Sequence, residues 1–308
     1  EPGRRMLLTR RSPGGGPDTL RVEFASGAAR ARAHLRRGRA DLVWPVPPGL
    51  LAQALPGEYR TLARAARPTR RLWLVMRADL PPTRKVEARR ALAHGLNRGG
   101  LLSASGRRGS EMGEWLPGGR AFDFPRRDAG LVREWLDRGR LGRSLHVVMA
   151  YPADGVGAEV ARAMQTEWAE LGLDVELRPL RGTALAAEAL GRGGAQLLLL
   201  EAQAPLADPA AELSVLVAPR RGPPVGAFRT GWSTREFDRW IGPQPPETAL
   251  DIDFAQRRLG EELVALPLLR LPWSWVERAG GVWIGFHPHF GPDPGRRSGA
   301  LAPPHQSR

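Results

Sequence analysis

Two closely spaced histidines are the residues of this sequence best placed to bind a metal ion. His287 and His289 stand in the run FHPHF, and alternate residues of a strand share one face. A protein zinc site normally needs at least three ligands, and no third candidate stands near this pair in the sequence. We therefore expect no metal site here.

Two pairs of carboxylates could in principle act as a general acid and a general base. Asp251 and Asp253 stand at the start of a predicted helix, where aspartate caps free backbone N–H groups. Glu261 and Glu262 are adjacent near the end of that helix and are typical of a solvated face. The chain also lacks GxSxG, GxxxxGK[ST], HExxH and a GxGxxG between strand and helix. These observations predict a protein that is not an enzyme and needs no cofactor.

Length and composition are those of a globular protein. The chain has 308 residues, of which 42% are hydrophobic and 25% charged, enough for one large or two ordinary domains. This composition excludes a disordered chain, a coiled coil and a collagen-like rod. No run approaches the roughly 18 apolar residues of a membrane helix. Cysteine is absent, which excludes disulfides, thiolate metal sites and cysteine nucleophiles.

The charge is strongly positive and unevenly distributed. The formal net charge is +14, and Lys85 is the only lysine among the 46 basic residues. Residues 1–150 carry a net +17, whereas residues 151–308 carry −3. The basic half could attract an anionic surface or ligand. Solvated faces of arginine-rich helices explain the same excess.

The most regular stretch of the sequence predicts the fold class. Strand-like segments at Leu145–Ala150, Leu173–Leu177 and Gln196–Leu200 alternate with helical segments at Ala158–Leu171 and Ala184–Leu190. Such a β-α-β-α-β series favours a parallel sheet with right-handed crossovers, so we expect an α/β domain.

Segments on either side of this series extend the prediction. Arg71–Met76 reads as a strand, followed by a helix over about Thr83–Arg98. Residues Pro205–Pro246 are rich in Pro and Gly and are expected to be irregular, with one short helix at Thr234–Ile241. A last helix is expected over Ile252–Leu266.

Four segments together resemble a known family. They are Leu35–Pro48, Leu72–Leu102, Asp128–Leu180 and Gly231–Ile241, and their order and spacing are similar to those of the extracytoplasmic solute-binding proteins of ABC-type importers, peptide/nickel family. The resemblance implies an α/β fold, a type II periplasmic-binding-protein lobe with a parallel-rich mixed sheet flanked by helices. It covers about residues 35–285.

The resemblance also implies a division of the chain, because the matching part is the C-terminal three-fifths of a typical member. Residues 1–19 are then a lead-in from a first lobe missing from this chain, and residues 20–266 are the second lobe. Residues 267–291 are expected to return toward the first lobe, and residues 292–308 to form a disordered tail.

The activity implied by the resemblance is capture of a small polar solute by hinge closure, without catalysis. Its partners would be an ABC permease and its ATPase subunits, with no nucleic acid, and membrane contact only through the permease or an upstream lipid anchor. The expected location is periplasmic or extracytoplasmic.

The residues that hold a peptide's ammonium group in this family are changed here. The family's tryptophan position falls on Ala202 and its ammonium-binding aspartate on Pro205, although Asp208-Pro209 stands in the expected place. A buried ammonium needs an anionic partner. Free peptide N-termini are therefore poor ligands unless Glu201, at a neighbouring strand position, binds the ammonium group instead.

Further ligand contacts are expected from the position of the family's binding segments. Tyr151 and Asp154 follow the first strand of the regular series, where the family contacts its ligand, and Trp232 is a third candidate. With Glu201 and Asp208 they make up the expected ligand-binding set.

Three other functions stay open at the level of the sequence. The same fold occurs as the ligand-sensing domain of transcriptional regulators, and an upstream helix-turn-helix would indicate that role. A degenerate fragment that binds nothing would melt without cooperativity. An arginine-rich nucleic-acid binder would show steep salt dependence.

Overall fold

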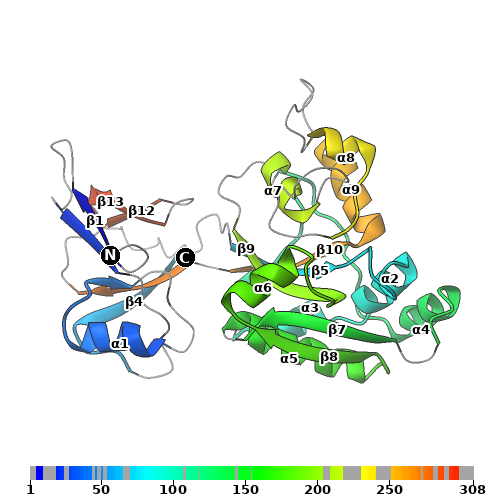
Figure 1. Cartoon of the computed structure of the whole chain (residues 1–308), viewed down its shortest axis with the longest axis horizontal. Helices are drawn as coiled ribbons and strands as arrows, with labels where there is room; N and C mark the ends of the chain where they lie inside the picture. The colour runs from blue at the N-terminus through cyan, green and yellow to red at the C-terminus, as the bar shows by residue number, and fades with distance from the viewer. Residues whose placement is uncertain are drawn as a thin grey trace, which may run out of the picture. The chain divides into compact units, whose positions relative to one another are not determined.

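A computed structural model describes most of the chain. The described residues are 5–9, 19–23, 28–43, 46, 50, 54–64, 70–106, 109–116, 118–142, 145–153, 155–203, 209–217, 230–240, 251–271, 273–279, 284–287 and 291–297. The chain divides into two compact units (Figure 1). Unit 1 comprises residues 1–67 and 272–308, and unit 2 comprises residues 68–271. No helix of the described residues is long and apolar enough to cross a membrane.

Unit 1 is built mainly of short antiparallel pairs. Its elements are β1 (Arg5–Thr9), β2 (Thr19–Glu23), α1 (Ala28–Arg36), β3 (Leu42–Val43), β4 (Tyr59–Arg64), β11 (Trp273–Arg278), β12 (Ile284–His287) and β13 (Gly291–Arg297). Strand β11 lies between β3 and β4 in a three-stranded sheet, so both ends of the chain contribute to it. A small core containing Leu35 of α1 and Val276 of β11 holds this sheet to the helix.

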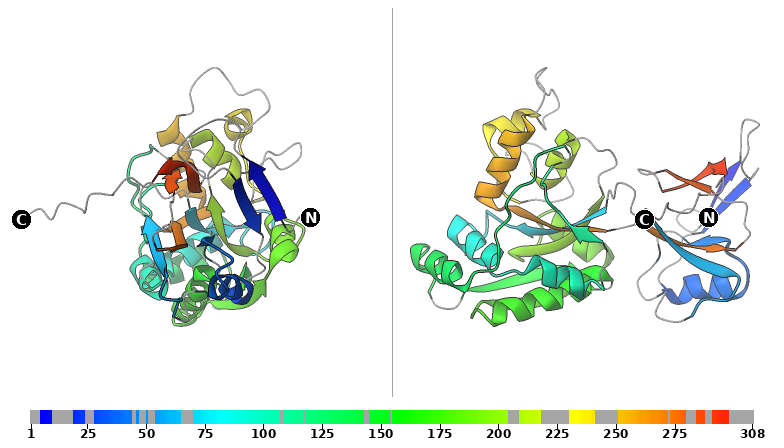
Figure 2. Two further views of the ribbon diagram at one scale, coloured as in Figure 1. Left: turned by 90° about the vertical axis from the view of Figure 1, so that its left-hand side faces the viewer. Right: turned by 180° about the vertical axis from the view of Figure 1, so that it is seen from behind.

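Unit 2 contains a six-stranded mixed sheet flanked by helices. Its elements are β5 (Arg70–Met76), α2 (Val86–His94), α3 (Arg98–Ala104), β6 (Ser110–Glu111), α4 (Ala129–Arg138), β7 (His146–Pro152), α5 (Val156–Ala169), β8 (Asp174–Leu180), α6 (Gly182–Ala189), β9 (Leu197–Gln203), α7 (Pro209–Leu216), α8 (Arg235–Trp240), α9 (Ile252–Glu262) and β10 (Ala265–Leu271). The strand order is β6-β10-β5-β9-β7-β8. Helices α7, α8 and α9 lie on the other side of the sheet from α5 (Figures 1 and 2).

The predicted β-α-β-α-β series is confirmed as β7-α5-β8-α6-β9. Strands β8, β7 and β9 are parallel neighbours, as the two crossovers require. Gly172 and Gly191 follow the two helices with φ of 77° and 74°, the left-handed region that glycine adopts without strain. The expected mixed sheet flanked by helices is confirmed, with β8, β7 and β9 as its parallel part and β5, β10 and β6 paired antiparallel. Those pairings join segments far apart in the chain and left no local signal.

The boundaries of the units differ from the expected division of the chain. Residues 20–67 belong to unit 1 rather than to one lobe reaching residue 266, and the chain leaves unit 2 after Leu271 rather than at residue 267. The difference arises because β10 completes the sheet of unit 2 before the chain crosses. Strand β13 at Gly291–Arg297 also lies inside the stretch expected to be disordered.

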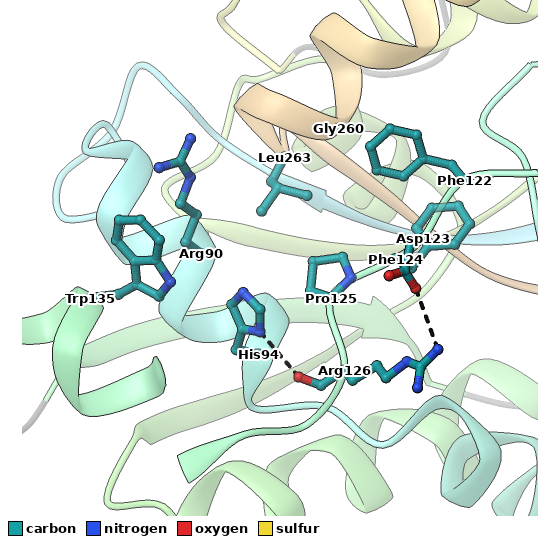
Figure 3. Close-up of a pocket in the computed structure, with 10 residues that line it drawn as sticks. All are labelled: Arg90, His94, Phe122, Asp123, Phe124, Pro125, Arg126, Trp135, Gly260 and Leu263. Carbon is teal, nitrogen blue, oxygen red and sulfur yellow. Dashed lines mark hydrogen bonds and ion pairs between the residues drawn. The ribbon is translucent and has the colours of Figure 1, made fainter. Parts of the chain in front are cut away.

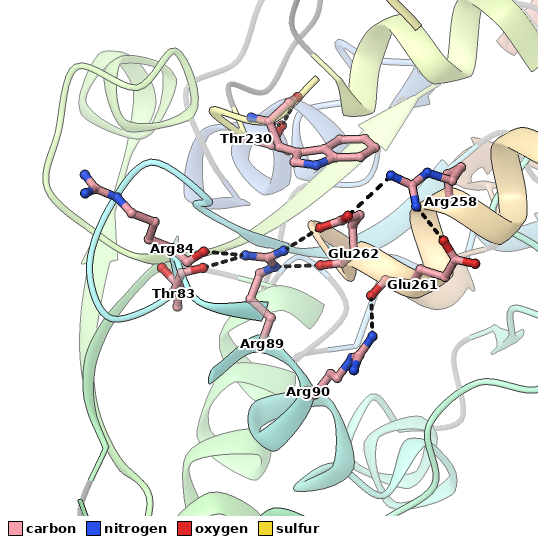
Figure 4. A network of polar contacts seen from close by, with 9 residues as sticks. Thr83, Arg84, Arg89, Arg90, Thr230, Arg258, Glu261 and Glu262 are labelled. Carbon is pink, nitrogen blue, oxygen red and sulfur yellow. Dashed lines mark hydrogen bonds and ion pairs between the residues drawn. The ribbon is translucent and has the colours of Figure 1, made fainter. Parts of the chain in front are cut away.

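Buried arginine contacts join α2 to the C-terminal end of α9. Arg89 is buried, and its Nε donates to the backbone oxygen of Glu262 at 2.6 Å while Nη1 donates to the backbone oxygen of Thr83 at 2.8 Å (Figure 4). Its Nη2 also contacts the Glu262 carboxylate at 3.0 Å. Arg90 donates to the backbone oxygen of Glu261 at 3.3 Å. These bonds satisfy carbonyl groups at a helix end that have no partner within the helix.

Candidate functional site

The carboxyl ends of the three parallel strands of unit 2 meet at one edge of its sheet. Pro152 at the end of β7 is aligned with Leu180 at the end of β8, and β9 runs parallel to β7 and ends at Gln203. At the same edge, Arg70 opens β5 opposite Gln203, and Leu271 ends β10 opposite Arg70. We name this edge the crossing edge, because both connections to unit 1 leave from it. In open α/β sheets, ligands bind outside the carboxyl ends of the strands.

Two of the expected ligand residues lie on strands that end at the crossing edge. Tyr151 is the next-to-last residue of β7. Its side chain is only 5% exposed and belongs to the hydrophobic core. Glu201 of β9 is exposed and stands opposite Leu72 in the register, whereas Ala202 stands opposite Arg71. Because successive residues of a strand face opposite sides of a sheet, Glu201 and position 202 belong to opposite faces.

Trp232 does not join these two residues. The backbone oxygen of Thr230 accepts from Ala78 N at 2.7 Å, which places this segment beyond Met76, at the end of β5 remote from the crossing edge. The Trp232 ring packs edge-on against Phe237 at 5.4 Å. No pattern in the sequence indicates which edge of the sheet this segment joins. Asp154 and Asp208 lie outside the described residues.

A buried ion pair lies beside the crossing edge and was not anticipated. Glu212 of α7 is 1% exposed and its carboxylate lies 3.1 Å from Nη1 of Arg71, whose side chain is 9% exposed. Burial raises the pKa of the Glu212 carboxyl, and the nearby Arg71 opposes that rise. Arg71 also donates to the backbone oxygen of Trp115 at 3.5 Å, a long contact. The available signal was an arginine directly before the apolar run LWLVM of the same strand, because an arginine buried with such a run needs an anionic partner.

A second ion pair stands next to the first. Arg270 of β10 lies opposite Arg71 in the antiparallel register, and its guanidinium contacts the carboxylate of Glu114. The proximity of Glu114 further raises the pKa of Glu212. The pair of Arg71 and Glu212 thus connects β5 to α7, and the pair of Arg270 and Glu114 connects β10 to the segment before Trp115.

The carboxylates considered for acid–base chemistry have structural partners. Asp251 caps α9 through a hydrogen bond from Phe254 N at 2.9 Å, which confirms that prediction. Asp253 instead pairs with Arg120 at 3.4 Å. The expected solvated face holds only in part, because Glu262 accepts from buried Arg89.

No metal site was found in the part of the chain that the structure covers. His287 lies on β12, and His289 falls outside the described residues. Within the described ranges, no three His, Asp or Glu side chains lie close enough together to hold a metal ion.

Comparison with known proteins identifies the family. Residues 1–223 match the bacterial extracellular solute-binding proteins, family 5 (middle region), which is more than half of the chain. The chain belongs to this family. A search of curated proteins gave no match.

Solved structures of binding proteins share the fold of this family 5 chain. A dipeptide-binding protein from Pseudoalteromonas sp. SM9913 in complex with Met-Leu is 16% identical with a TM-score of 0.73, covering 94% of this chain and 60% of that one. NikZ from Campylobacter jejuni in complex with Ni(L-His) is 13% identical with a TM-score of 0.75, covering 96% and 64%. AgaA from A. tumefaciens R10 in complex with agropinic acid is 16% identical with a TM-score of 0.71, covering 91% and 60%. The chain thus spans about three-fifths of the length of these proteins.

Proposed function

We propose that this chain captures a small polar solute for an ABC-type import system and does not catalyse a reaction. Membership of family 5 supports solute binding, and members of that family are periplasmic or extracytoplasmic. The same extracytoplasmic location, with delivery to a permease and its ATPase, is proposed for this chain. Hinge closure around the solute would be the step that commits it to transport.

The proposal places the solute at the crossing edge of unit 2. The observation that carries it is the meeting of the ends of β7, β8 and β9 at the edge from which both connections to unit 1 leave. Glu201 supplies an exposed carboxylate there, and Tyr151 supplies the buried wall behind it. Asp154 and Asp208 are proposed as additional contacts from their positions in the sequence.

The altered positions Ala202 and Pro205 bear on the kind of solute. Positions 202 and 205 carry neither the tryptophan nor the aspartate that the family resemblance implies for binding a peptide ammonium, so that anionic partner is missing from its usual place. We therefore propose a solute recognised through hydrogen bonds and contacts with Glu201, and not a peptide held by its N-terminus.

Calorimetric titration of the full chain tests this proposal. The probes are Met-Leu, agropinic acid and Ni(L-His), the ligands in the three similar structures, with the first expected to bind weakest. For any probe that binds, Glu201→Gln should weaken the affinity about tenfold, as expected for loss of a charged contact. Glu134→Gln, on the exposed surface of α4, is the matched control.

Three outcomes would contradict the proposal. Equal binding by the Glu201→Gln and Glu134→Gln variants would remove the crossing edge as the site. If none of the probes gives a heat of binding and the thermal melt lacks cooperativity, the chain is better explained as a degenerate fragment that binds nothing. A chain found joined to a DNA-binding helix-turn-helix would favour a sensor of gene regulation.

A further inference from the structure

A pocket on unit 2 lies away from the crossing edge. It has a volume of about 300 Å³ and is bounded by α2, by residues 122–126, by α4 and by the C-terminal end of α9 (Figure 3). None of the residues that line it belongs to β5, β7, β8 or β9. A larger depression of about 640 Å³ lies along the same segment and shares residues 122–126 with it.

One part of the pocket wall is apolar and largely aromatic. Trp135 of α4, Phe122, Phe124 and Leu263 all line it. Gly260 allows the close approach of Phe122 to α9, because a Cβ at that position would lie 2.6 Å from the phenyl ring. Pockets with apolar walls and a few polar groups are the usual sites for small ligands, and this volume is at the lower end of their range.

Arg90 supplies a positive charge next to the Trp135 ring. Its guanidinium lies 4.6 Å from the centre of that ring and donates to the backbone oxygen of Glu261. Among the described residues, no carboxylate forms an ion pair with Arg90, whereas the neighbouring Glu261 pairs with Arg258. The pocket therefore contains a cation that a ligand carboxylate can pair with.

Two ring nitrogens add to this polar wall. Nδ1 of His94 lies 3.1 Å from the backbone oxygen of Arg126; because a carbonyl can only accept, Nδ1 is the donor, and Nε2 of the neutral ring is an acceptor. The indole N–H of Trp135 is buried and has no hydrogen-bond partner in the described part of the chain. A buried donor without a partner is costly unless something accepts from it. Asp123 faces Arg126 at 3.6 Å, so these two charges largely offset each other.

We propose that this pocket binds a small carboxylate with an apolar body, such as an aromatic acid. The carboxylate would pair with Arg90 and accept from the ring N–H of Trp135, close to His94, while the body would pack against Phe122, Phe124 and Leu263. This second site is independent of the solute site proposed at the crossing edge, since the two share no residue.

Nuclear magnetic resonance of the full chain, titrated with benzoate, tests the proposal. We expect the indole N–H signal of Trp135 and the ring signals of His94 to shift with one common saturation curve. Trp135→Phe and His94→Gln spectra assign those signals. Arg90→Gln should weaken benzoate binding about tenfold or more, and Arg90→Lys should recover part of it. Arg133→Gln, an equal loss of charge on an exposed face of α4, should leave binding unchanged.

Two further probes separate the charge from the apolar body. Inorganic phosphate lacks the body and benzyl alcohol lacks the charge, so each should bind at least about tenfold more weakly than benzoate. Equal benzoate affinity of Arg90→Gln and Arg133→Gln would overturn the proposal, as would the absence of saturable shifts. A thermal melt of each variant separates lost binding from lost folding. These signals report only on this pocket, so the result stands whether or not the crossing edge binds a solute.

Discussion

Glu212 is a buried carboxyl whose pKa is raised, mainly by burial, so its effect on stability depends on pH. The folded chain keeps this proton to a higher pH than the unfolded chain does. The stability it contributes is therefore fully present below the ordinary value of 4.5 and is lost as the pH rises through the raised folded pKa.

Glu212→Gln tests this linkage because the amide resembles the protonated acid and does not titrate. We expect the decline in the urea midpoint above about pH 4.5 to be smaller in this variant than in the wild type. Glu134→Gln, on an exposed face of α4, should retain the wild-type slope. A Glu212→Gln slope equal to that of the wild type would show that this carboxyl titrates normally.

Gly95 occupies a position at which even one methyl group has no room. A Cβ there would lie 2.6 Å from Cδ1 and 2.9 Å from Nε1 of Trp168, which is fully buried and donates to the backbone oxygen of Leu92. Gly95→Ala should lower the free energy of unfolding by about 1–3 kcal/mol, the usual cost of overpacking, measured by urea denaturation. Gly113→Ala meets nothing within 4 Å and serves as the control. Equal stability of the two variants would contradict this packing.

At the scale of elements, Arg89 holds the end of α9 to α2. Its planar guanidinium reaches Glu262 and Thr83 in different directions, a geometry that an ammonium group cannot reproduce. Arg89→Lys should lower the free energy of unfolding by about 2–4 kcal/mol, because buried carbonyl groups lose their donors. Arg258→Lys changes an exposed pair on α9 and should cost no more than about 1 kcal/mol. Urea denaturation measures both, and similar losses would refute a special role for Arg89.

Local sequence pattern predicted the helices and strands of this fold better than it predicted which strands pair with each other. The series from β7 to β9 was predictable because strand and helix periods alternate over short distances. The pairing of β5 with β9 was not, because it joins residues 70–76 to residues 197–203 and depends on tertiary packing. Helix α7 at Pro209–Leu216 was expected to be irregular, because it lies within Pro205–Pro246, a stretch rich in proline and glycine. Helix α9 ends at Glu262 rather than Leu266, because Ala265 already pairs with Val75.

The candidate site was predictable only in part for the same reason. The order of the strands placed Tyr151 and Glu201 near one edge, but burial of Tyr151 and the remote position of Trp232 follow from packing. The ion pair of Arg71 and Glu212 joins two segments about 140 residues apart, a distance over which sequence pattern says nothing of contact.

At the scale of the whole molecule, unit 2 has the features of an independent folding unit. Its core residues all lie between Leu72 and Leu271, and the small core of unit 1 is separate from them. A chain of residues 68–271 should therefore unfold in a single cooperative transition. Circular dichroism with a thermal melt measures this. Coincident melting curves at two wavelengths would support it, and a broad, gradual loss of signal would oppose it.

The position of β11 between β3 and β4 has a consequence for biosynthesis. Residues 1–67 are synthesised before Trp273–Arg278, and within the described residues β3 and β4 pair only with β11. Until β11 has been made, the edges of these two strands stay open to other chains while unit 2 folds. Nascent chains halted before residue 273 would thus combine a folded unit 2 with exposed strand edges that favour aggregation.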